Sequence, residues 1–131
     1  MPSLHDDDIL SRFAYDRDHI RADGTVRAQL LKPKKGKGLS VFEVTNLAHF
    51  AICDHGHRYA DNPTIGRIHF GYVALTCKDV YAEGLQPHYD NIPLRHVSIP
   101  FNTDDLERRT ALAQALARKA GPLQDCSSLT K

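Results

Sequence analysis

The chain carries almost no net charge and has no long hydrophobic run. Its 17 Lys and Arg residues nearly balance its 16 Asp and Glu residues, which leaves a formal net charge of +1. No overall field therefore draws the protein onto nucleic acid or an anionic membrane, and any electrostatic attraction must come from a local patch. No segment approaches the length of a membrane span, and residues 1–8 are acidic rather than apolar. We therefore expect no membrane anchor and no secretory signal.

Cysteine is also scarce. The three cysteines, Cys53, Cys77 and Cys126, are odd in number and share no CxxC spacing. This pattern is typical of free thiols in a reducing cytosol, so we expect a cytoplasmic protein in which Cys53 and Cys77 are buried. Glycine-rich phosphate loops, GxSxG elbows and HExxH motifs are absent as well, and no cofactor is expected.

The length and composition are those of one globular domain. The chain has 131 residues, of which 41% are hydrophobic and 25% are charged, and a domain of this size buries roughly two-thirds of its unfolded surface. Neither repeats nor a linker divide the sequence. We expect a single domain over residues 1–131, with loose ends at residues 1–8 and 123–131.

Hydrophobic patterning and turn residues predict an α+β fold. The expected strands are residues 11–15, 25–31, 39–45, 65–76 and 94–99, and the main helices run from 47 to 59 or 60 and from 104 to 120. Thr45 or Asn46 can cap the first helix and Thr103 the second, while residues 78–83 form one or two helical turns. These elements predict a mainly antiparallel sheet of four to five strands packed against two helices. Strands 25–31 and 39–45 would pair with each other.

Three short motifs occur in the order Ser11-Arg12-Phe13, Ser40-Val41-Phe42 and Arg95-His96-x-x-Ile99. This order resembles a family of small, mostly bacterial proteins, and the similarity extends over residues 9–120. Cys53 occupies a position where that family has a tryptophan. The resemblance implies an order of elements rather than a particular chemistry. The polar positions that it shares with the family are Arg12, Ser40, Arg95 and His96.

The Arg95-His96 pair, with Arg12 as a third member, is the leading candidate for a catalytic site. Prolines before and after the pair restrict the backbone and hold both side chains in fixed directions at a strand edge. His96 could act as a general base while an arginine binds a phosphate or carboxylate. The alternative is structural, because adjacent residues of a strand point to opposite faces.

A basic segment, residues 32–38, is the leading candidate for a binding surface. We call it the lysine loop, and its four lysines are Lys32, Lys34, Lys35 and Lys37. Proline and glycine exclude regular structure there. The lysines could contact phosphate groups of a nucleic acid or nucleotide, or they could form a solvated loop that keeps neighbouring strands from aggregating.

Two further clusters have the residue types for chemistry. His49, Cys53 and His57 recur every four residues on one face of the expected helix, where zinc could bind with a fourth ligand from His69, His88 or His96. A chance scatter of histidines is the alternative, and no metal is predicted. Cys77 precedes the short helix at 78–83, whose N-terminus would favour a reactive thiolate, although burial in a strand is the alternative.

These observations predict a cytosolic binding module that contacts a protein or a phosphate-bearing partner. The binding residues would be those of the lysine loop together with Arg95 and His96. One alternative is a small toxin-like enzyme acting on RNA or a nucleotide, with His96 and a second histidine as acid and base. Another is an inhibitor of the replication machinery that binds through residues 124–129.

Overall fold

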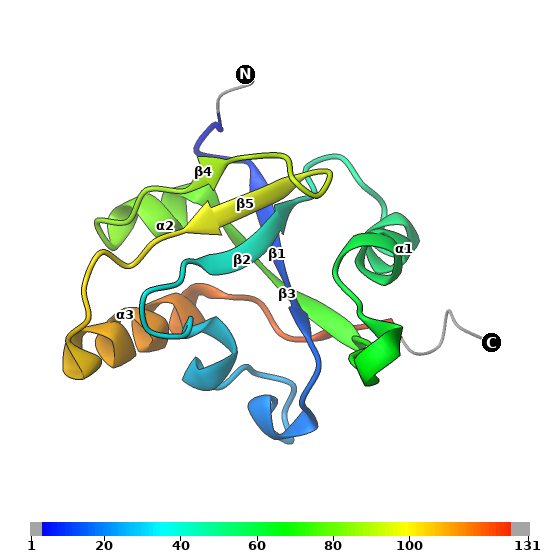
Figure 1. Cartoon of the computed structure of the whole chain (residues 1–131), viewed down its shortest axis with the longest axis horizontal. Coiled ribbons are helices and arrows are strands. Elements are labelled where there is room, and N and C mark those ends of the chain that lie inside the picture. Colours follow the sequence, from blue (N-terminus) through cyan, green and yellow to red (C-terminus); the bar gives the residue numbers. More distant parts are fainter. Residues whose placement is uncertain (1–3, 127–131) are drawn as a thin grey trace.

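The chain folds around one six-stranded antiparallel sheet with the strand order β4-β5-β2-β1-β3-β6 (Figure 1). The computed structural model describes residues 4–126. The strands are β1 (Ile9–Ala14), β2 (Leu39–Glu43), β3 (Gly71–Thr76), β4 (His88–Tyr89), β5 (His96–Ile99) and β6 (Gln124–Asp125). The helices are α1 (His49–Tyr59), α2 (Cys77–Ala82) and α3 (Leu106–Lys119). The predicted α+β class with an antiparallel sheet is confirmed.

The sheet has more strands than predicted because two short ones, β4 and β6, extend its edges. Each has two residues, which is too short to leave a hydrophobic pattern. The short helical segment after β3 is a third α-helix, α2, so residues 4–126 contain three helices where two main ones were expected. Its N-terminus has a capping box in which the Thr76 hydroxyl accepts a bond from the Asp79 amide.

The predicted strand at residues 25–31 is wrong. Residues Ala28–Leu31 form a 3-10 turn, in which the neighbouring side chains of Leu30 and Leu31 are both buried. A strand would point these two side chains to opposite faces, whereas the turn packs both into the core beside α3. The expected pairing of this segment with β2 is therefore also wrong, and β2 pairs with β1 and β5 instead.

Alternation along the strands gives the sheet two apolar faces. One face packs against α2, α3 and the Ala28–Leu31 turn through residues such as Leu10, Val41 and Val97. The opposite face carries Phe13, Phe42 and Tyr72 and is covered by α1, which lies apart from the other two helices (Figure 1). This face of the sheet also carries the polar side chains of Ser40 and His96.

Both main helices begin later than the capping residues predicted. The Thr45 hydroxyl accepts a bond from the Ile9 amide at 2.9 Å, and Asn46 has a left-handed backbone with φ of 69°, so neither residue caps α1. The Thr103 hydroxyl accepts a bond from the Asp105 amide at 3.2 Å in the turn before α3. The Thr45 hydroxyl therefore ties the chain after β2 to the start of β1, and the Thr103 hydroxyl stabilises the turn that leads into α3.

The segments next to the sheet make defined contacts. Residues 5–8 form a turn that is bonded to the start of α2 through the Lys78 and Cys77 amides. At the other end, Gln124–Asp125 form β6 and the Cys126 amide bonds to the Phe70 carbonyl at 2.9 Å. Residues 127–129 of the predicted binding segment lie outside the described residues. Within residues 4–126, no helix combines the length and apolar character needed to cross a membrane.

Candidate active site in a cationic cleft

The loop between β4 and β5 sends Arg95 and His96 in different directions. Asn91 and Arg95 have left-handed backbones, with φ of 57° and 68°, and the Asn91 side chain accepts a bond from the Arg95 amide at 2.7 Å. Arg95 then pairs with Glu43, with 3.0 Å between Nη1 and Oε1. Arg95 therefore anchors the loop to β2, and the two side chains of the predicted pair have different partners.

His96 lies between a serine and a carboxylate. Its Nε2 is 2.6 Å from Oγ of Ser40 on β2, and its Nδ1 is 2.7 Å from Oδ1 of Asp90. In a neutral imidazole whose Nδ1 donates its proton to the Asp90 carboxylate, Nε2 has the lone pair that accepts the Ser40 hydroxyl proton. This is the order of groups that activates a serine nucleophile in hydrolases of unrelated folds.

The sheet register brings these groups together. Ser40 pairs with Ser98 and Phe42 pairs with His96, so Ser40 and His96 are diagonal neighbours on the face that α1 partly covers. The His96 side chain keeps 15% of its surface exposed and that of Asp90 keeps 45%. Among residues 4–126, the side chains that hydrogen-bond His96 are those of Ser40 and Asp90, and the second histidine expected beside it is not one of them.

Ser40 lines two adjoining clefts. The larger, of about 510 Å³, is strongly cationic, and its charged lining residues are Arg12, Lys32, Lys34, Lys37, Arg67 and Asp16. The smaller, of about 170 Å³, is bounded by His96 and by aromatic rings that include Tyr15 and Tyr59. A ligand in the larger cleft would meet positive charge next to Ser40.

Arg12 positions Ser40 from the opposite side. Its Nη1 donates to the Ser40 carbonyl at 2.9 Å and its Nε donates to the Leu30 carbonyl at 3.0 Å. Burial lowers the pKa of the Arg12 guanidinium. Arg12 thus ties β2 to the Ala28–Leu31 turn, so the structure brings two of the three predicted catalytic candidates, Arg12 and His96, to the same serine.

The lysine loop forms one wall of the larger cleft, and three of its four lysines line it. Lys35 is the exception. Arg109 of α3 is buried and donates a hydrogen bond to the Pro33 carbonyl, which anchors the loop to the core. The core therefore holds the lysine loop in place. The local sequence does not show that this loop lies beside Ser40.

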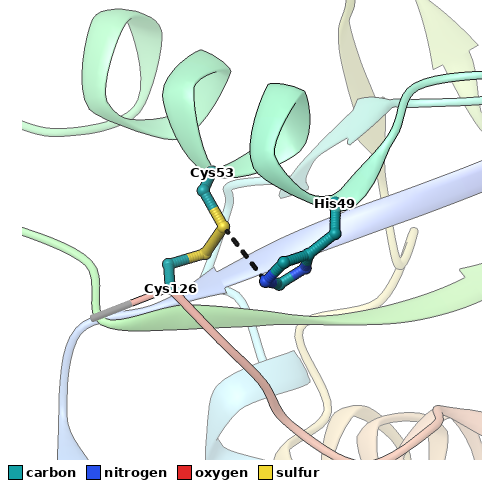
Figure 2. A group of neighbouring side chains, drawn as sticks. All are labelled: His49, Cys53 and Cys126. Carbon is teal, nitrogen blue, oxygen red and sulfur yellow. Dashed lines mark hydrogen bonds between the residues drawn. A yellow bond between two sulfur atoms is a disulfide. The ribbon is translucent and has the colours of Figure 1, made fainter. Parts of the chain in front are cut away.

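The three predicted metal ligands of α1 separate into two groups. His49 Nε2 lies 3.7 Å from the Cys53 sulfur, beside Cys126 (Figure 2). His57 instead bonds Asp61, with 2.8 Å between Nδ1 and Oδ2, and its ring is stacked 4.3 Å from that of His69.

Cys53 and Cys126 form a disulfide, so the prediction of free thiols is wrong at these positions. Cys126 lies beside α1 because β6, the strand that precedes it, pairs with β3. This is a tertiary contact, so the local sequence gives no sign of the disulfide. Free thiols at Cys53 and Cys126 therefore no longer support the expected reducing compartment.

Cys77 is free and fully buried, as predicted, and it is not a reactive nucleophile. Burial, together with the nearby carboxylates of Asp8, Glu43 and Asp6, raises the pKa of the Cys77 thiol to about 12. The thiol therefore stays protonated at neutral pH. The helix N-terminus does not overcome this cost of burying a charge.

Comparisons with protein-family models, with curated proteins and with solved structures give no match. The resemblance carried by the three short motifs therefore stays a prediction. Function has to be argued from the site itself.

Proposed function

We propose that the protein is a small enzyme that cleaves or transfers a phosphate ester, with Ser40 as its nucleophile. The observation that carries the proposal is the hydrogen-bonded chain from Asp90 through His96 to Ser40, next to a cleft lined by arginine and lysine. A phosphate-bearing substrate such as a nucleotide matches the charge of that cleft.

Each residue has a role in the proposed reaction. The Ser40 oxygen attacks phosphorus as His96 Nε2 takes the hydroxyl proton, and that proton then passes to the departing ester oxygen. Asp90 holds the imidazole in the required tautomer. Arg67 and the cleft lysines stabilise negative charge on the phosphoryl oxygens. Water or an acceptor hydroxyl, deprotonated by His96, then releases the phosphoryl group from Ser40.

The smaller pocket suits the rest of such a substrate. The Arg67 guanidinium lies 4.0 Å from the centre of the Tyr15 ring, and both line the pocket next to His96. A flat base can stack against aromatic rings and guanidinium groups of this kind. A nucleotide could therefore place its base in the smaller pocket and its phosphate in the larger cleft.

Ester substrates with a nitrophenol leaving group test the enzyme proposal. We expect Ser40→Ala and His96→Ala to lower kcat/KM on nitrophenyl phosphate mono- or diesters at least about a hundredfold. Ser98→Ala is the matched control, because Ser98 pairs with Ser40 across the two strands and should leave the rate unchanged. Absence of turnover in the native protein, or full activity in Ser40→Ala, would refute the proposal. Turnover of a nitrophenyl carboxylic ester alone would replace it with acyl transfer.

A second candidate function is binding of a phosphate-bearing partner, or of a protein with such groups, without turnover. The observation that favours it is the supported cationic wall made by the lysine loop. Proteins that recognise phosphate through a lysine-lined cleft need no nucleophile.

Pyrophosphate binding, measured by calorimetry at low and moderate salt, tests this second function. We expect Lys34→Ala to weaken binding about fivefold, whereas Lys35→Ala should have little effect because Lys35 does not line the cleft. Equal losses for the two variants would show that the ion contacts the loop nonspecifically. Binding that persists in Ser40→Ala, in a protein without ester turnover, would favour this function over the enzyme.

A further inference from the structure

We propose that reduction of the Cys53–Cys126 disulfide converts the cluster of His49, Cys53 and Cys126 into a zinc site. Figure 2 shows the three side chains together, with His49 and Cys53 projecting from α1 and Cys126 approaching from the chain after β6. The nitrogen and sulfur donor atoms of the cluster lie within 4.8 Å of one another. Imidazole nitrogen and thiolate sulfur are ligands that Zn²⁺ prefers.

The spacing of His49 and Cys53 suits a tetrahedral ion. The two residues are one helical turn apart, and 3.7 Å separates His49 Nε2 from the Cys53 sulfur. Zinc–nitrogen and zinc–sulfur bonds of about 2.0 and 2.3 Å, at a tetrahedral angle, place the two donor atoms roughly 3.5 Å apart. The helix therefore already holds two ligands at close to the required separation.

Cys126 supplies the third ligand only after reduction. In the disulfide each sulfur is bonded to the other and neither is a thiolate. Two electrons and two protons from a dithiol convert the disulfide into two thiols, and the dithiol becomes a disulfide. Zinc then displaces the thiol protons of Cys53 and Cys126 as the two metal–sulfur bonds form.

The surroundings of His49 favour a change of tautomer that frees its ligand nitrogen. In the oxidised protein Nε2 lies 3.1 Å from the Asp125 carbonyl, and Nδ1 lies 2.9 Å from the Tyr72 hydroxyl. With zinc at Nε2, the imidazole proton sits on Nδ1 and the Tyr72 oxygen accepts it. Such an outer hydrogen bond orients a metal-bound histidine.

The cluster is accessible despite its buried sulfurs. His49 is exposed, whereas Cys53 and Cys126 keep 2% and 0% of their surface. β6 is a two-residue edge strand with two residue pairs to β3, so local opening exposes the sulfurs to a reductant at low cost. The open side at His49 leaves the fourth zinc position to water.

The neighbouring group of His57, Asp61 and His69 is a poorer metal site. Both Asp61 oxygens are engaged, Oδ2 by His57 and Oδ1 by the His69 amide, at 2.8 and 3.0 Å. Two imidazoles are left as ligands. We therefore expect that His57 does not bind the zinc, and His57→Ala serves as the control variant.

The test compares zinc binding by the oxidised and reduced chain. After reduction with a phosphine, which is itself converted to the phosphine oxide, we expect about one Zn²⁺ per chain by elemental analysis after desalting. The oxidised chain should retain essentially none. Cobalt added to the reduced chain should give a thiolate-to-metal charge-transfer band, which a site without sulfur would lack.

Variants identify the ligands. His49→Ala should weaken zinc binding by the reduced chain at least about tenfold, Cys126→Ala should remove the cobalt–thiolate band or reduce it by half, and His57→Ala should change neither. His49 is exposed on the helix surface, so its variant keeps the test valid if Cys126→Ala fails to fold. The proposal is overturned if the reduced chain binds no zinc, if the oxidised chain binds as much, or if His57→Ala weakens binding as much as His49→Ala.

Discussion

Replacing Cys126 with alanine is expected to lower the free energy of unfolding by about 4 kcal/mol under oxidising conditions. The disulfide closes a loop across 73 residues, so it removes many conformations from the unfolded chain. In the folded protein it also fastens β6 to α1, because β6 has only two residue pairs to β3. Loss of the bond should therefore loosen the edge of the sheet first.

Urea denaturation followed by circular dichroism measures this effect. A reductant should destabilise the native protein by nearly the amount lost in Cys126→Ala, when a chelator is present to keep zinc from the reduced sulfurs. Cys77→Ala is the control, since Cys77 is a free buried thiol and its variant should remain sensitive to the reductant. Equal stability of the native protein and Cys126→Ala would show that the disulfide is dispensable.

Gly56→Ala is expected to destabilise the protein by about 1–3 kcal/mol, even though alanine favours a helix by about 1 kcal/mol over glycine. A Cβ atom at position 56 would lie 2.5 Å from a ring carbon of Phe13 and 2.6 Å from Nε2 of His69. Neither ring can move freely, because both are buried and His69 Nε2 is bonded to the Cys53 carbonyl. Glycine therefore lets α1 approach the sheet closely.

The steric contact lowers the stability of the Gly56→Ala protein, whereas helix propensity raises it. The sign of the measured change in stability therefore shows which effect is larger. Thermal and urea denaturation should both show that the variant is less stable than the native protein, because α1 has to shift away from Phe13. Arg58→Ala on the exposed side of α1 introduces no steric contact and removes only an exposed ion pair with Asp54, so it should change stability by less than about 0.5 kcal/mol. A more stable Gly56→Ala protein would mean that α1 has room to adjust.

The sequence predicted the helices and strands that local residue patterns specify. Alternation identified β2, and the acidic start and basic end of α3 agree with a helix at residues 106–119. The local pattern gave a wrong prediction at Leu30 and Leu31. Both of these adjacent residues are buried against α3, which favours a turn there and not a strand. It also missed β4 and β6, which exist because longer strands offer them unpaired edges.

The sequence by itself determined a cationic loop, an α+β domain and the polar residues Arg12, Ser40 and His96 that its motifs contain. Only the tertiary structure decided that Asp90, His96 and Ser40 form one hydrogen-bonded chain, and that Arg95 turns away to Glu43. It also decided that Cys53 forms a disulfide with Cys126, while His57 bonds to Asp61. The physical reason is that hydrogen bonds and disulfides act over a few ångströms in space, while these partners lie on different strands and loops. Sheet register and helix packing, which sum contacts over the whole chain, determine which of them meet.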